Sequence, residues 1–245
     1  VMNINKDQIP PRAWSNIIAN EKFGTITTEN SGGYTWQENS RLNRITTWEN
    51  DAIQDFKSEE IIIKDIDQKQ YWNLGSDSEN NSYQVRYGMG YSKYLQINNN
   101  IIQENTIFVP VDGAIKINHI ILKNRDRNKR RLTLYYAINT SLGEERNKNL
   151  GKIKVSKNDN IIELENICKT NFNKKVEITS SDKIKGYTNN YKDFYTEQMN
   201  PIKGINQKEL KPDGNILIKN ELVVEIPIEL DGFERKNLNI LVGNN

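Results

Sequence analysis

The sequence is poor in the residues on which most catalytic and metal sites depend. Its 245 residues contain one cysteine, Cys168, and one histidine, His119. An internal disulfide is therefore excluded, and we expect a reducing, cytoplasmic setting. His119 lies in the middle of a predicted strand, where we expect a hydrogen-bonded imidazole, and no serine has the sequence context of a nucleophile elbow. One histidine and one cysteine cannot supply a zinc site with its usual ligands, so we predict no metal site.

Strong net charge and long apolar runs are absent as well. There are 34 basic and 32 acidic residues, the formal net charge is +2, and the mean hydropathy is -0.77. Balanced charge gives little long-range attraction to nucleic acid or to an anionic membrane, and no run is long enough to span a bilayer. The one basic run, at 123–131, also contains Asp126, and we interpret it as a solvated hairpin turn between two strands. We therefore predict neither a nucleic-acid nor a membrane partner for this chain.

Neighbouring acidic residues do occur, for example at 59–60 and 144–145. A glycosidase needs two carboxyl groups at a fixed spacing across a cleft. Adjacent glutamates on a strand do not meet that requirement by themselves, and we interpret them as surface charge.

What the sequence does contain is a series of short strand patterns. Runs rich in β-branched and aromatic residues alternate with Gly, Asn, Asp and Pro. These runs lie at 23–29, 60–66, 82–88, 91–97, 101–110, 114–124, 130–142, 151–157, 160–166 and, as a pair, within 220–242. The apolar residues at alternate positions from Leu132 to Ile138 share one face, because successive side chains point to opposite sides of a strand.

The predicted architecture is an all-β, large antiparallel β-sandwich that occupies residues 1–245 as one domain. At most one or two short helices fit the pattern, and the plausible one is 190–200, which Pro201 would end. The links at 125–128, 158–160 and 231–235 read as turns within strand pairs, and 200–215 reads as loop.

The window most suited to binding is "GGYTWQENSRLNRITTWENDAI", at 32–53. The apolar faces of a pyranose lie flat on aromatic rings, and its hydroxyl groups bond to amide, carboxylate and guanidinium groups. Alternatively, the tryptophans anchor the core and the polar residues cap turns, and composition leaves both readings open. The candidate substrate-binding residues are Tyr34, Trp36, Asn39, Arg41, Asn43, Trp48, Asn50 and Asp51.

Residues 10–53 resemble the start of the glycoside phosphorylases of glycoside hydrolase family 94, formerly glycosyltransferase family 36. The family pattern reads approximately P-R-P-W-x-N, F-G, G-Y-(T/S)-W, N-S-R-x-N, L-T-x-W and N-D, and this chain departs from it only at Ala13 and Ile45. "YQVRYGMGYSKY" at 83–94 is also similar, with Tyr87 where the family usually has His. Residues 108–110 and 130–138 also match, and 186–201 match more loosely, so the resemblance extends over nearly the whole chain.

The resemblance implies a super-sandwich that forms the N-terminal part of a longer enzyme. In the family, a helical (α/α)₆ barrel follows and carries the general acid, while inorganic phosphate attacks the anomeric carbon with inversion. This chain is then expected to hold no catalytic residue and no cofactor, and to be inactive alone. The expected parent cleaves β-gluco-oligosaccharides to a sugar 1-phosphate, or is a related cyclic β-1,2-glucan synthase.

The resemblance also implies a role for this domain within the parent enzyme. It would form one wall of the active site and part of a homodimer interface, with its candidate residues from Trp36 to Asp51 on loops at one end of the sandwich, facing a cleft. Two alternatives from other classes stay open: a stand-alone, non-catalytic sugar-binding module, and a purely structural dimerisation domain.

Overall fold

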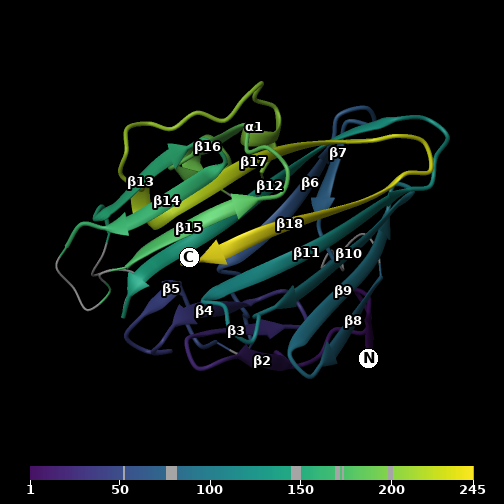
Figure 1. Ribbon diagram of the computed structural model, residues 1–245. Helices are drawn as coiled ribbons and strands as arrows, with labels where there is room; N and C mark the ends of the chain where they lie inside the picture. The colour runs from purple at the N-terminus through teal and green to yellow at the C-terminus, as the bar shows by residue number, and fades with distance from the viewer. Residues whose placement is uncertain are drawn as a thin grey trace.

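The computed structural model describes residues 1–51, 53–75, 82–144, 150–168, 172, 174–197 and 201–244. Two large antiparallel sheets pack against each other, as Figure 1 shows, and the described helices are single turns. The all-β sandwich expected from the strand patterns is confirmed.

The first sheet has nine strands, and every neighbouring pair is antiparallel. In spatial order these are β1 (Met2–Ile4), β8 (Tyr83–Gly88), β9 (Tyr91–Asn98), β10 (Ile101–Phe108), β11 (Ile115–Asn124), β18 (Arg235–Gly243), β15 (Lys175–Ser180), β14 (Ile161–Asn166) and β13 (Ile153–Asn158). Side chains alternate along the strands, so that Ile120 and Leu122 of β11 face the second sheet and are fully buried.

The second sheet is built around the longest strand. Its main path is β16 (Gly186–Thr188), β17 (Glu221–Leu230), β12 (Arg130–Gly143), β5 (Arg44–Thr46), β4 (Gly33–Gln37), β3 (Phe23–Thr28) and β2 (Ser15–Ala19). The edge of β12 that faces away from β17 pairs first with β6 (Glu59–Asp65) and then with β5, and β7 (Gln70–Asn73) lies beyond β6. The 14 residues of β12 therefore join two groups of strands into one sheet.

Both faces of β12 are buried. The predicted apolar face, from Leu132 to Ile138, packs in the main core between the sheets, as expected. On the other face, Tyr135 lies with Phe194 in a second core, to which Tyr191, Tyr195, Ile205 and Leu210 also belong. The segment after β16 therefore folds back over the outer surface of this sheet, where Figure 1 shows α1 (Ile202–Ile205).

At two places where the sequence predicts paired neighbouring strands, the chain instead crosses from one sheet to the other. β11 pairs with β18 and β12 pairs with β17, so the links at 125–129 and 231–234 each carry the chain from one sheet to the other. They lie side by side in Figure 1, and the Phe233 N–H donates to the Asp126 carbonyl at 3.0 Å. The prediction of hairpins at these two links was wrong, because the two strands that each link joins belong to different sheets. The predicted β13–β14 hairpin around 158–160 is confirmed.

The basic run that includes the first crossing is not a solvated turn throughout. Arg130, at the start of β12, is 2% exposed and forms an ion pair with the fully buried Asp65. Its Nη1 also donates to Asp126 at 2.5 Å, which fixes the crossing against the end of β6. The run is therefore a structural element of the sandwich.

The predicted helix at 190–200 was wrong. Tyr191–Asp193 forms one 3₁₀ turn, η2, capped by Asn190, whose side chain accepts from the Lys192 N–H; residues 198–200 lie outside the described part of the chain. The single α-helical turn among the described residues, α1, begins directly after Pro201. Pro201 therefore precedes a helix, where its fixed φ is favourable, and does not end one.

Candidate functional site

The predicted binding residues are distributed along the short strand β4 and its two flanking segments. Tyr34 lies in β4, and so does Trp36, for which the expected loop was wrong. The other six lie outside strands, as predicted: Asn39, Arg41 and Asn43 between β4 and β5, and Trp48, Asn50 and Asp51 after β5. The motif is thus one strand with a polar turn at one end and a polar loop after β5.

Three rings and one guanidinium form a single cluster next to β4 and β5. Tyr34 stacks on Trp48 with ring centroids 4.5 Å apart and ring planes 14° apart. The Trp36 ring is tilted by 35° to the Tyr34 ring, and their centroids are 5.1 Å apart. We call these three rings the aromatic stack. The guanidinium carbon of Arg44 lies 5.6 Å from the Tyr34 centroid and 6.0 Å from that of Trp48, so a cation lies next to two of the three rings.

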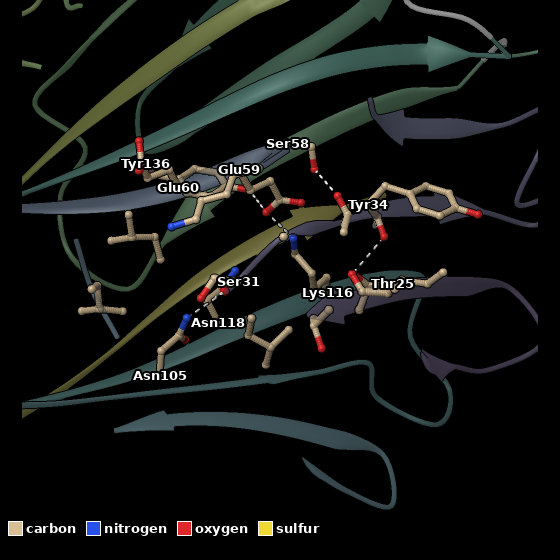
Figure 2. A pocket seen from close by; sticks show the side chains of 18 of the residues that line it. Thr25, Ser31, Tyr34, Ser58, Glu59, Glu60, Asn105, Lys116, Asn118 and Tyr136 are labelled. Atoms are coloured by element: carbon tan, nitrogen blue, oxygen red, sulfur yellow. Dashed lines mark hydrogen bonds and ion pairs between the residues drawn. The ribbon is translucent and has the colours of Figure 1, made fainter. Parts of the chain in front are cut away.

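The stack lies on the outer surface of the second sheet. Thr35, between the two stack residues of β4, points inward to Lys116, and alternation places Tyr34 and Trp36 on the opposite side. Figure 2 shows the Tyr34 ring directed away from the interior, where Lys116 and Glu59 meet. Aromatic side chains therefore face outward at this position, which fits a binding surface better than a core anchor.

The three rings do not have equal access to solvent. Tyr34 is 5% exposed, whereas Trp36 and Trp48 are half-buried. Burial raises the pKa of the Tyr34 phenol, while its hydrogen bond to the Ser40 carbonyl, at 3.2 Å, acts in the opposite direction. Tyr34 is therefore a neutral support in the middle, and the two indoles provide the ring surface that remains open to a ligand.

Gly24 makes room for one indole. It is the cross-strand neighbour of Trp36 on β3, and a Cβ at Gly24 would lie 2.2 Å from Cζ2 of that ring. No side chain larger than hydrogen fits unless the indole moves. The sequence carried this signal in the F-G of the family pattern, but the contact itself depends on the strand register.

Two of the polar candidates cap turns. Asn39 Oδ1 accepts from the N–H groups of Arg41 and Leu42, at 3.0 and 2.8 Å. Asp51 Oδ1 accepts from the N–H groups of Gln54 and Ile53, and these bonds lower the pKa of its carboxyl group. These side chains shape the backbone around the aromatic stack, which was the alternative role for them.

The remaining polar candidates differ in their surroundings. Arg41 is exposed, and its Nε lies 3.6 Å from Glu144 Oε1. Asn50 is exposed with a φ of 54°, a left-handed conformation that asparagine tolerates. Asn43 is half-buried, and its Oδ1 has no hydrogen-bond partner among the described residues. Of these three, Arg41 and Asn50 are open to solvent, whereas the Asn43 Oδ1 is buried.

A second polar group, which the sequence did not predict, lies behind β4 between the sheets. The side chain of Lys116 is 4% exposed and pairs with Glu59, which also accepts from Tyr136 Oη at 2.6 Å (Figure 2). Burial and the Glu59 carboxylate raise the pKa of Tyr136. The adjoining cavity measures about 50 Å³, far below the several hundred Å³ of a typical ligand pocket. This cavity is therefore too small to hold a sugar ring.

The single histidine lies outside the aromatic stack, on β11. His119 Nδ1 lies 2.8 Å from Asn239 Oδ1, a satisfied imidazole on β11 as expected. Within the part of the chain that the structure describes, no group of three or more His, Cys, Asp or Glu side chains is placed to hold a metal ion. None of the described helices is long and apolar enough to cross a membrane.

Comparison with known proteins identifies the family. The model of the glycosyl hydrolase 94 supersandwich domain matches residues 1–245. The chain belongs to this family. The resemblance read from the motif around the aromatic stack is therefore confirmed over the whole supersandwich domain.

Relatives of the supersandwich domain are much longer proteins. It is 28% identical to an N,N'-diacetylchitobiose phosphorylase of Vibrio proteolyticus over 136 residues, 54% of this chain and 17% of that protein. It is 28% identical to the cyclic β-(1,2)-glucan synthase NdvB of Rhizobium meliloti over 142 residues, 56% of this chain and 5% of that protein. The supersandwich domain thus matches only a small part of the length of these relatives.

A solved structure supports the fold alone. A galactose mutarotase related enzyme from Lactobacillus acidophilus superposes with a TM-score of 0.53 at 8% identity, covering 95% of this chain and 97% of that one. The two-sheet architecture therefore recurs at a sequence similarity too low to carry over any residue's role.

Proposed function

We propose that this supersandwich domain forms one wall of the sugar site of an inverting glycoside phosphorylase, and that Trp36 and Trp48 contact the sugar. The observation that supports this is the aromatic stack: a buried Tyr34 holds two partly exposed indoles on one outer surface. The C–H faces of a pyranose pack on such rings, and the exposed Arg41 side chain, in the turn between β4 and β5, offers hydrogen-bond donors to hydroxyl groups.

The reaction itself belongs to the parent enzyme. Inorganic phosphate is the co-substrate that attacks the anomeric carbon, and a carboxylic acid protonates the leaving sugar. We assign that acid to a helical catalytic domain that completes the site, and no catalytic role to any residue of this chain. A homodimer in the cytoplasm, with this domain at the subunit interface, is part of the same proposal.

The substrate class we propose is a β-linked gluco-oligosaccharide. One relative is named for N,N'-diacetylchitobiose and another for a cyclic β-(1,2)-glucan. An assay panel should therefore contain β-1,2- and β-1,4-gluco-oligosaccharides together with N,N'-diacetylchitobiose. The sugar whose phosphorolysis has the highest kcat/KM then defines the specificity.

The test is substitution of the open indoles in the full-length enzyme. Trp36→Ala and Trp48→Ala should each raise KM for the best sugar about two- to tenfold, since one stacking contact is worth about 0.5–1.5 kcal/mol. Phe233→Ala is the matched control, because Phe233 is 60% exposed on the crossing between β17 and β18. Wild-type kinetics in both tryptophan variants, with thermal unfolding unchanged, would reject the proposed wall.

The partly exposed indoles also support the second candidate, a stand-alone sugar-binding module. Calorimetric titration of the 245-residue chain with the same sugars separates the two. We expect weak binding or none, because a single wall buries little of a ligand's surface. A Kd near 10 µM, a free energy of about -7 kcal/mol, would favour the module instead.

A further inference from the structure

The interior of the sandwich holds two amide side chains whose hydrogen-bonding capacity is half used. Asn105 on β10 and Asn118 on β11 are 5% and 3% exposed. Asn105 Nδ2 donates to Asn118 Oδ1 at 3.4 Å, as Figure 2 shows. Asn105 Oδ1 and Asn118 Nδ2 have no hydrogen-bond partner among the described residues. One acceptor and one donor therefore point into the core unpaired.

Both amides line the small cavity behind β4. The cavity measures about 50 Å³ and is also lined by Lys116, Glu59 and Tyr136. A buried polar atom without a partner destabilises a fold, and native proteins usually satisfy it with protein or ordered water. A cavity needs about 10–15 Å³ for each water, so this one has room for about three to five.

We propose that this cavity binds a cluster of ordered water molecules that joins the Asn105–Asn118 pair to the Lys116–Glu59 ion pair. Water fits because the cavity presents an acceptor and a donor together, and each water both donates and accepts. A cation would face Lys116 and the amide N–H groups of Asn118. An anion would face the carboxylate of Glu59, and a sugar ring exceeds the volume.

The water cluster would support the strand that carries the aromatic stack. Thr35 on β4 donates to Glu59 Oε1 at 3.0 Å and lies 3.2 Å from Lys116 Nζ, from which it accepts. The inner face of β4 therefore rests on polar groups that border the cavity, while its outer face presents the indoles. The waters are in this sense a structural ligand behind the proposed sugar surface, independent of whether sugar binds there.

Solution NMR of the 245-residue chain tests the proposal. Waters held longer than about a nanosecond give negative cross-relaxation peaks to nearby amide protons, and we expect such peaks at the Asn118 side-chain NH₂. Asn100 is the control, because its side-chain amide is exposed and bonds to Asp126. Assigned Asn118 NH₂ resonances without these peaks would overturn the proposal.

A crystal structure supplies a second, independent measurement. Ordered density within hydrogen-bond distance of Asn105 Oδ1 and Asn118 Nδ2 is the expected result. A cavity without density, or one closed by a direct second bond between the two amides, would contradict it. Asn118→Leu should remove the density next to residue 118, because that side chain no longer donates.

Discussion

At the scale of single residues, the contact between Gly24 and Trp36 leaves no room for a side chain at position 24. Gly24→Ala places a methyl group where the indole now lies, 2.2 Å from Cζ2. We expect a loss of about 1–3 kcal/mol of unfolding free energy and a displaced indole. Urea denaturation measures the first, and tryptophan fluorescence measures the second. Gly113→Ala is the control, since a Cβ there meets its nearest neighbour at 3.3 Å; equal effects at both positions would refute the packing argument.

Glu29 is a buried acid that directly follows β3, the strand that contains Gly24. It is 5% exposed, its Oε2 accepts from the Trp14 N–H at 2.6 Å, and burial raises its pKa above the ordinary 4.5. The folded state therefore favours the protonated acid. Its contribution to stability is full below pH 4.5 and is lost as pH rises through the higher, folded pKa.

Glu29→Gln should therefore raise the melting temperature at pH 7, since the amide keeps an acceptor for Trp14 and loses the buried charge. The gain should shrink as pH falls through the raised, folded pKa and vanish below pH 4.5, where the wild-type acid is protonated in both states. Thermal unfolding between pH 4 and 8 measures it, with the exposed Glu21→Gln as control. A gain that grows toward acid pH would have the wrong sign.

The sequence predicted which residues make up the candidate site, but not which of them are exposed and which cap turns. Tyr34, Trp36 and Trp48 do lie together, because alternation and a short turn bring them to one surface. Their exposure could not be read from sequence, since it depends on which face of β4 points outward. Arg44 was missed for the same reason: it joins the stack only through its pairing with Trp36.

At the scale of elements, the long strands were predictable and the short ones were not. The alternation of apolar residues over most of its length predicted β12, whereas β4, which has only five residues, was interpreted as part of a binding loop. The crossings between sheets were missed because their Asp, Asn and Gly residues are also those of hairpin turns. Sequence shows that the chain reverses there, but the partner of each strand depends on tertiary packing.

The buried ion pair at the start of β12, where the chain crosses between the sheets, can be tested by substitution. Asp65 at the end of β6 is fully buried against Arg130, while the nearby Asp67 pairs with the exposed Arg131. Asp65→Asn should cost about 3 kcal/mol of unfolding free energy, because it leaves a buried guanidinium with one carboxylate fewer. Asp67→Asn, the matched control, should cost less than about 1 kcal/mol. Chemical denaturation measures both, and similar losses would show that the buried pair has no special weight.

At the scale of the whole molecule, one core joins the two sheets. The main hydrophobic cluster contains Leu122 and Ile240 of the first sheet and Leu134 and Val224 of the second. A hydrogen bond also crosses the interface, from Trp72 Nε1 on β7 to Gln103 Oε1 on β10, at 2.7 Å. Neither sheet can bury its apolar face without the other, so the domain should unfold as a unit.

Circular dichroism and tryptophan fluorescence should therefore report the same urea midpoint, even though the chain is longer than most two-state domains. Trp72→Phe removes the donor to Gln103 and should lower the unfolding free energy by about 1–2 kcal/mol while both probes still coincide. Trp14→Phe is the control, because Trp14 is 60% exposed. Separate midpoints in the wild-type chain would mean that the sheets are stable independently, and the shared core would then not be what holds the aromatic stack in place.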